Sequence, residues 1–159
     1  MTILNMREAL ALFVKTMECP DTLVKRNIGP ARIVFSDGED HLVMFKRDYY
    51  KNFGKHFQGV KKENGKTYGW GQIMSASLLD TACNNCGWVV FITPDGKIYR
   101  CRPLLFKKFV QKYGTEVPHL KGEVAMPLDY FERVGGVNEQ NMGRETGKRT
   151  GTKTISDYV

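Results

Sequence analysis

Residues 30–48 constrain the fold of this chain more than any other stretch. They contain two apolar runs, 33–35 and 42–45, on either side of Asp37-Gly38. β-Branched and aromatic residues that flank an Asp-Gly turn predict a β-hairpin. The second predicted strand runs into Lys46, where the most basic and most aromatic part of the chain begins. We therefore expect a buried hairpin that delivers charged side chains to a cationic surface.

The remaining segments predict helices and further strands around this hairpin. Asn5 and Glu8 have the spacing of a capping box before an apolar stripe of helical period that ends at Cys19-Pro20. A second helix is expected over 72–86, a strand hairpin over 88–102, a third helix from Pro103, and extended chain over 116–134. This order predicts an α/β fold, in which one mixed β-sheet is flanked by helices.

Length and composition set the domain organisation. A chain of 159 residues is long enough for one domain with a real core, expected over residues 1–134. Residues 135–159 carry five glycines and few apolar side chains, so we expect a flexible, basic, Gly/Thr-rich tail. Arg7, Glu8 and Lys15 interrupt the N-terminal apolar stripe, which predicts neither a signal peptide nor a membrane partner. We expect a cytoplasmic protein with reduced cysteines.

Positive charge is concentrated in two windows of the sequence. Residues 46–66 have a net charge of +5, and residues 97–112 contain six Lys or Arg and no acid. Such a distribution favours a polyanionic partner, with DNA expected rather than RNA, while a solubilising basic face is the alternative. Aromatic faces between lysines can stack on bases while the lysines meet phosphates. The candidate nucleic-acid-binding residues are Arg47, Lys51, Lys55, Lys61, Lys62, Lys66, Arg100, Arg102, Lys107, Lys108 and Lys112, with Tyr49, Tyr50 and Trp70.

The cysteines raise a separate hypothesis. Cys83 and Cys86 have metal-ligand spacing, Cys101 lies one predicted hairpin away, and Cys19 or His119 could be a fourth ligand. A zinc ribbon needs two such pairs in turns, whereas this single pair lies on the apolar face of a predicted helix. We expect buried structural thiols rather than zinc ligands. A cysteine-based metal-binding regulator remains an alternative function.

The order helix, hairpin, helix, strands resembles the restriction-endonuclease-like core of the PD-(D/E)XK nucleases, and particularly of the archaeal Holliday-junction resolvases. That resemblance places Lys46 at the family's lysine, Glu8 at its first-helix glutamate and Gln72 at its later glutamine. It implies Mg²⁺-dependent phosphodiester cleavage by two acids on adjacent strands. In this chain Ala31 and Met44 occupy the positions of those acids.

Carboxylates near these positions could replace the missing acids. Asp48 follows Lys46 by two residues, Asp40 shares its strand face, and Asp37 lies in the turn. With Glu8 they could rebuild a Mg²⁺ site, but they are also ordinary turn, cap and ion-pair residues, and we favour that interpretation. The predicted function is a basic nucleic-acid-binding protein of nuclease-like fold, either a Mg²⁺-dependent structure-selective endonuclease or an inactive relative. A non-enzymatic structural protein that binds an acidic partner is the alternative, and a homodimer is left open.

Overall fold

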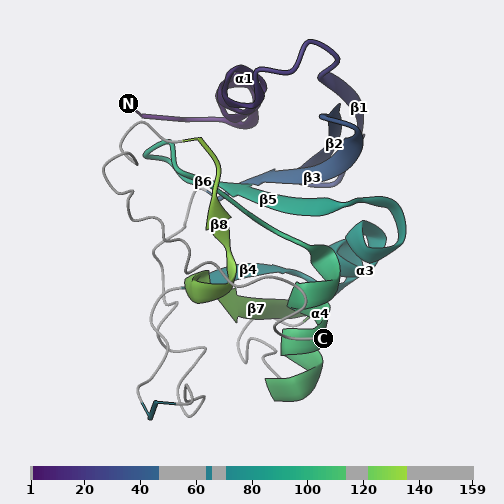
Figure 1. The fold of residues 1–159 in the computed structure, drawn as a ribbon, viewed down its shortest axis with the longest axis vertical. Helices are drawn as coiled ribbons and strands as arrows, with labels where there is room; N and C mark the ends of the chain where they lie inside the picture. The colour runs from purple at the N-terminus through teal and green to yellow at the C-terminus, as the bar shows by residue number, and fades with distance from the viewer. Residues whose placement is uncertain (1, 47–63, 66–70, 114–121, 136–159) are drawn as a thin grey trace.

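The computed structural model describes residues 2–46, 64–65, 71–113 and 122–135, which form a layered α/β fold (Figure 1). The larger sheet has six strands, in the order β1 (Leu23–Ile28), β2 (Ala31–Ser36), β3 (Glu39–Phe45), β5 (Trp88–Ile92), β6 (Ile98–Cys101) and β8 (Glu132–Arg133). β3 and β5 are parallel, and the other neighbours are antiparallel. A smaller antiparallel sheet pairs β4 (Gly71–Ser75) with β7 (Glu123–Pro127). The predicted α/β class and mixed sheet are confirmed.

The helices lie on the two faces of the larger sheet. α1 (Met6–Met17) covers one face, while α3 (Ala76–Asn85), α4 (Pro103–Tyr113) and the smaller sheet cover the other (Figure 1). A short 3₁₀ helix, η1 (Leu128–Tyr130), connects β7 to β8. None of the helices in the described ranges has the length and apolar character that crossing a membrane requires.

The predicted hairpin is present. Ser36 pairs with Glu39, so a two-residue loop joins β2 to β3. Asp37 and Gly38 have φ of 53° and 80°, as a type I′ turn requires at both central positions. This turn matches the twist of the strands that it joins, which fixes the pairing register.

Alternation along β3 divides its side chains between two cores. Val43 packs with Phe13 of α1 in the first core, which also contains Val90 of β5. Leu42 and Met44 point to the opposite face, into a larger core with α3, α4 and the smaller sheet. Because successive side chains of a strand point to opposite faces, Lys46 follows Met44 onto that second face.

The second helix begins four residues later than we predicted. Residues 71–75 form a strand because they pair with β7, with Ile73 opposite Ala125. Ser75 then caps α3, its Oγ accepting from the backbone N–H groups of Ser77 and Leu78. Gln72 therefore lies within a strand and does not open a helix.

The other predicted elements are largely confirmed. Asn5 Oδ1 accepts from the Glu8 N–H at 2.9 Å, as the predicted capping box requires, while Glu8 Oε1 accepts at 2.6 Å from the N–H of Leu4, the residue before the cap. The hairpin β5–β6 and the helix that starts at Pro103 are also present. The predicted tail lies outside the described residues except at Gly135.

Candidate functional site

Lys46 connects the two sheets. Its backbone N–H donates to the Ile92 carbonyl at 2.8 Å, which extends the pairing of β3 with β5 by one residue. Its Nζ donates to the Ile73 carbonyl of β4 at 2.5 Å and lies 5.7 Å from the centroid of the Phe91 ring. The ammonium group is thus held against the smaller sheet, where it satisfies a backbone acceptor.

The positions that the resemblance assigns to metal-binding acids are adjacent but apolar. Ala31 and Met44 stand directly opposite each other across β2 and β3, on the face that Lys46 shares. Their exposed fractions are 0% and 4%, because both pack in the larger core. Neither side chain offers the oxygen that Mg²⁺ requires.

Glu8 cannot reach this position. α1 lies on the face of the sheet that carries Val34 and Val43, whereas Ala31 and Met44 lie on the other face. The Glu8 carboxylate instead caps its own helix through the Leu4 N–H. Glu8 and Lys46 therefore belong to opposite faces of the larger sheet, and the predicted catalytic role of Glu8 stays a prediction.

Asp37 and Asp40 lie at the opposite end of the hairpin from Lys46. Asp40 precedes Lys46 by six residues, or about 20 Å along an extended strand. Asp40 pairs with Lys25 at 2.9 Å, and Asp37 is a turn residue with positive φ. These acids fulfil the ordinary roles that we favoured, and neither can replace an acid beside Lys46.

The described residues consequently do not fit a Mg²⁺ site of the kind that the resemblance implies. No group of three or more His, Cys, Asp or Glu in the described ranges could hold a metal ion. Asp48, the remaining substitute, lies outside these ranges and stays a prediction. Gln72 is fully buried in β4, and neither its Oε1 nor its Nε2 has a hydrogen-bond partner.

Most of the first basic window lies outside the described residues. This applies to nine of the candidate binding residues and to the substitute acid Asp48; the nine are Arg47, Tyr49, Tyr50, Lys51, Lys55, Lys61, Lys62, Lys66 and Trp70. The described residues on the two sides of this range, Lys46 and β4, are joined by the bond to the Ile73 carbonyl.

Most cations of the second basic window pair with acids outside the window, three of them with acids that are distant in sequence. Four cations have carboxylate partners, in the pairs Arg100–Glu132 (2.8 Å), Arg102–Glu39 (2.7 Å), Lys107–Asp80 (2.9 Å) and Lys97–Asp95 (3.5 Å). Lys108 and Lys112 form no ion pair with another described residue. The described ranges as a whole contain 13 Lys or Arg and 11 Asp or Glu, so most of the net charge of +7 lies elsewhere in the chain.

The two arginines of β6 form a stack with Trp88 that we did not predict. The guanidinium carbons of Arg100 and Arg102 lie 3.7 and 3.6 Å from the centroid of the Trp88 ring. Alternate residues on one strand face are about 6.6 Å apart, which leaves room for one aromatic ring between them. Two guanidinium groups at these distances would overlap on a single ring face, so they lie on opposite faces of the indole.

Glu39 organises one side of this stack. Its Oε1 accepts from Trp88 Nε1 at 2.8 Å and its Oε2 from Arg102 Nη1 at 2.7 Å. The bond to Arg102, together with that to Trp88, lowers the pKa of the Glu39 carboxyl group against the opposing effect of burial. On the other side, Glu132 Oε1 accepts from Arg100 Nε. We call Arg100, Trp88 and Arg102, with Glu39 and Glu132, the arginine ladder.

Gly87 is required where the ladder crosses β5. A Cβ at this position would lie 2.5 Å from Glu39 Oε2 and 3.2 Å from Arg102 Nη1. Arg102 Nη1 also donates to the Gly87 carbonyl at 2.9 Å. The reason for a glycine at this position is close packing against an ion pair.

His41 lies beneath the ladder and is 1% exposed. Its ring stacks on Trp88 at 6.4 Å between centroids and meets Phe13 edge-on at 5.3 Å. Burial lowers the pKa of His41, and the nearby Arg100 charge lowers it further. The imidazole is therefore held in its neutral form between α1 and the ladder.

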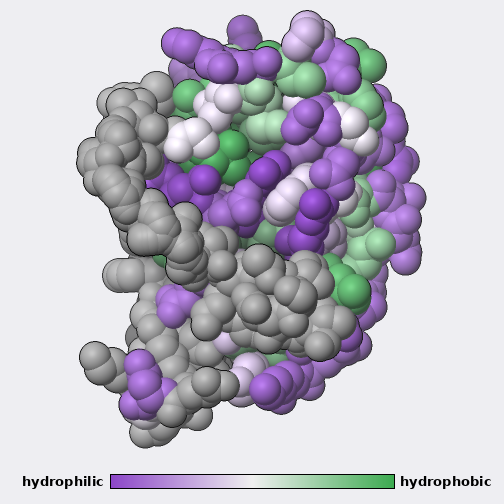
Figure 2. All heavy atoms as spheres, in the orientation of Figure 1, coloured by the Kyte–Doolittle hydropathy of each residue, from purple (hydrophilic) through white to green (hydrophobic). Residues whose placement is uncertain are grey.

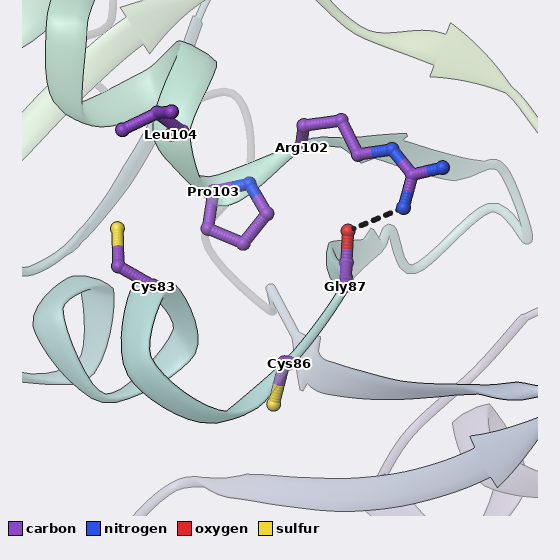
Figure 3. A pocket seen from close by; sticks show the side chains of 6 residues that line it. All are labelled: Cys83, Cys86, Gly87, Arg102, Pro103 and Leu104. Atoms are coloured by element: carbon purple, nitrogen blue, oxygen red, sulfur yellow. Dashed lines mark hydrogen bonds between the residues drawn. The ribbon is translucent and has the colours of Figure 1, made fainter.

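The cysteines do not converge. Figure 3 shows the Cys83 sulfur pointing toward Pro103 and Leu104, while the Cys86 sulfur points to the other side of the chain. The two residues line an open hollow of about 440 Å³ together with Gly87, Arg102, Pro103 and Leu104. Burial raises the pKa of all three thiols, and it raises that of Cys86 to about 11. The divergent thiols of Cys83 and Cys86 do not fit a shared zinc site.

Comparison of the chain with protein-family models, with curated proteins and with solved structures found no match.

Proposed function

We propose that this protein binds nucleic acid, with DNA preferred, and that it is a catalytically inactive relative of the restriction-endonuclease-like nucleases. The proposal that the protein is catalytically inactive depends on one observation, the opposed and buried side chains of Ala31 and Met44 beside Lys46. Carboxylates at those two positions would meet across adjacent strands, which is the arrangement that the resemblance implies. The chain has apolar side chains there instead.

The arrangement of the strands supports the relationship. A helix precedes three antiparallel strands, and a second helix crosses to a strand that is parallel to β3. Lys46 ends β3 on the face of Ala31 and Met44, as the family's lysine does beside its acids. Its ammonium group serves a backbone carbonyl of β4, a structural use that accords with a site no longer devoted to phosphate chemistry.

The distribution of charge supports nucleic-acid binding through residues 46–66. Seven Lys or Arg stand in this window with only two acids. By contrast, the second window has carboxylate partners for most of its cations. Long-range attraction to phosphates is therefore expected from the first window.

Two paired charge reversals test this proposal. Lys61→Glu with Lys62→Glu should weaken duplex binding by at least tenfold at ~100 mM salt and reduce the salt dependence, since each lost phosphate contact lowers the slope by about one. Lys107→Glu with Lys108→Glu carries the same formal change and should have a much smaller effect. Equal effects of the two pairs, or no effect of either, would contradict the proposal.

The absence of catalysis needs its own experiment. The pure protein should not cleave branched, duplex or single-stranded DNA with Mg²⁺ or Mn²⁺. Metal-dependent cleavage that disappears in Lys46→Ala and Asp48→Asn would show that a carboxylate outside the expected positions has rebuilt the active site. In that event the protein is an endonuclease and the inactive assignment is wrong.

One observation favours the alternative of a protein that binds an acidic protein partner. The described surface is almost neutral overall, which gives an ordinary soluble fold with a single basic segment. Failure to bind any nucleic acid at ~50 mM salt would support this alternative, since nonspecific binding is strongest at low salt.

A further inference from the structure

We propose that the arginine ladder is a second, short-range contact for the phosphate backbone of bound nucleic acid. This inference rests on the proposed function and adds to it a fixed binding element on the sheet face that carries α1. The residues are Arg100 and Arg102, held by Trp88, Glu39 and Glu132. None of them belongs to the basic segment that supplies the long-range attraction.

The ladder lies at a partly open part of the sheet. Trp88 and Arg100 stand on the same face as Val90, and Trp88 packs against the core beneath α1 while part of its surface stays exposed. The side chains of Arg100 and Arg102 are 22% and 38% exposed. Figure 2 shows hydrophilic side chains crossing the middle of this side of the molecule, over β5 and β6 and below α1. The ladder can therefore be reached from solvent.

The hydrogen bonds of the ladder leave guanidinium edges available. Arg102 uses Nη1 for Glu39 and Gly87, and Arg100 uses Nε for Glu132. Arg102 Nε and Nη2, and both terminal nitrogens of Arg100, have no hydrogen-bond partner among the described residues. A guanidinium group that retains two N–H donors on one edge can bind a phosphate through both.

The stack also fixes the geometry of those edges. Free arginine side chains lose up to about 2 kcal/mol of rotamer entropy when they are ordered by a ligand. In this chain each guanidinium is already clamped between an indole face and a carboxylate. The two guanidinium carbons are at most about 7.3 Å apart, which is the sum of their distances from the ring centroid. The ladder thus presents two preorganised donors for neighbouring oxyanions.

The acids of the ladder determine its role. With Glu39 and Glu132 ionised, the ladder is neutral overall and adds little long-range attraction. It acts only on a phosphate that is already close, and phosphate contacts of this kind fix the position of a nucleic acid on a protein.

The test compares two kinds of substitution at Arg100 and Arg102. Arg100→Lys with Arg102→Lys keeps both charges but loses the planar fork, so duplex affinity should fall about five- to tenfold while the salt dependence stays unchanged. Arg100→Gln with Arg102→Gln should lower affinity further and reduce the salt slope by about two. Arg26→Lys, an exposed position on β1, is the matched control and should bind like the unsubstituted protein.

Trp88 provides a local readout that a purely structural ladder would not give. In a Trp70→Phe background Trp88 is the only indole, since the chain has two tryptophans. Saturating duplex should change its emission, and the change should disappear in the paired lysine variant. All variants are compared well below their melting temperatures, with circular dichroism to verify folding.

Two failures are distinguishable. If the protein binds DNA, but the lysine variants bind equally well and Trp88 emission is unaffected, the ladder is structural and the proposed function survives. If the unsubstituted protein binds neither duplex nor single strands, the proposed function itself is wrong and this inference fails with it.

Discussion

The substitution Lys46→Met tests whether Lys46 has a structural role or a catalytic one. Methionine preserves the unbranched aliphatic chain but removes the ammonium group that donates to the Ile73 carbonyl at 2.5 Å. A hydrogen bond to a charged group contributes about 1.5–3 kcal/mol, and the half-buried position of Lys46 places the expected loss near the lower end. The contact with the Phe91 ring would also change from cation–π to thioether–aromatic. We expect the free energy of unfolding to fall by about 1–2 kcal/mol.

The assay is urea unfolding followed by circular dichroism, with Lys108→Met as the control. Lys108 is similarly half-buried but forms no ion pair with another described residue, so its substitution should change stability by less than about 0.5 kcal/mol. A catalytic lysine behaves differently, because its removal often leaves stability unchanged or raises it while activity is lost. If Lys46→Met is as stable as the unsubstituted protein, the structural role derived from the Ile73 contact is refuted.

Three further predictions concern the larger core, the ladder and His41. Met44→Ala should cost about 2–5 kcal/mol of unfolding free energy, measured by urea titration, because this 4% exposed side chain packs in the larger core; a change below about 1 kcal/mol would show that the position is open. Gly87→Ala should displace Glu39 and lower the melting temperature. In the double variant Gly87→Ala with Glu39→Ala, the melting temperature should fall by less than the sum of the falls in the two single variants. Additive falls would contradict the predicted clash. Because the pKa of His41 is lowered in the fold, the unfolded chain binds more protons than the folded chain at acidic pH. The free energy of unfolding should therefore fall as the pH drops through about 6.5, the ordinary pKa of histidine. His41→Phe should reduce this pH dependence, and an unchanged pH profile would contradict the role of His41.

Local signals accounted for most of the predicted elements. The Asp37-Gly38 turn, the Asn5–Glu8 capping box and Pro103 at a helix start each depend on residues within a few positions, and each is present in the fold. A continuous apolar run also identified the buried strand β5. These features need no knowledge of the rest of the chain, because their physical basis is in the backbone and its nearest neighbours.

The strand β4 could not be predicted in this way. Ile73 pairs with Ala125, so the reason that residues 71–75 are extended is found far along the chain. Their apolar spacing is equally compatible with the first turn of a helix, which is how we interpreted it. Ser75 was the available signal, because a serine that caps a helix limits where that helix can begin.

The charge count of residues 97–112 was misleading for the same reason, because it ignores residues that are distant in sequence. Counting residues 97–112 found no acid, yet Arg102 pairs with Glu39 across 63 positions of sequence, and Arg100 pairs with Glu132 across 32. A window measures only local charge, whereas strand pairing brings distant carboxylates beside the arginines. Ion pairs with these carboxylates therefore offset much of the positive charge that the count of the second window indicated.

The same comparison explains where affinity for a polyanion must originate. The described fold contains nearly equal numbers of basic and acidic side chains, while residues 46–66 retain a net charge of +5. Lys46, which begins this segment, is joined to the core through the Ile73 carbonyl. Under the proposed function, long-range attraction and positional contact belong to separate residues. That separation is why lysine reversal in the segment should alter the salt dependence, while Arg-to-Lys substitution in the ladder should alter affinity alone.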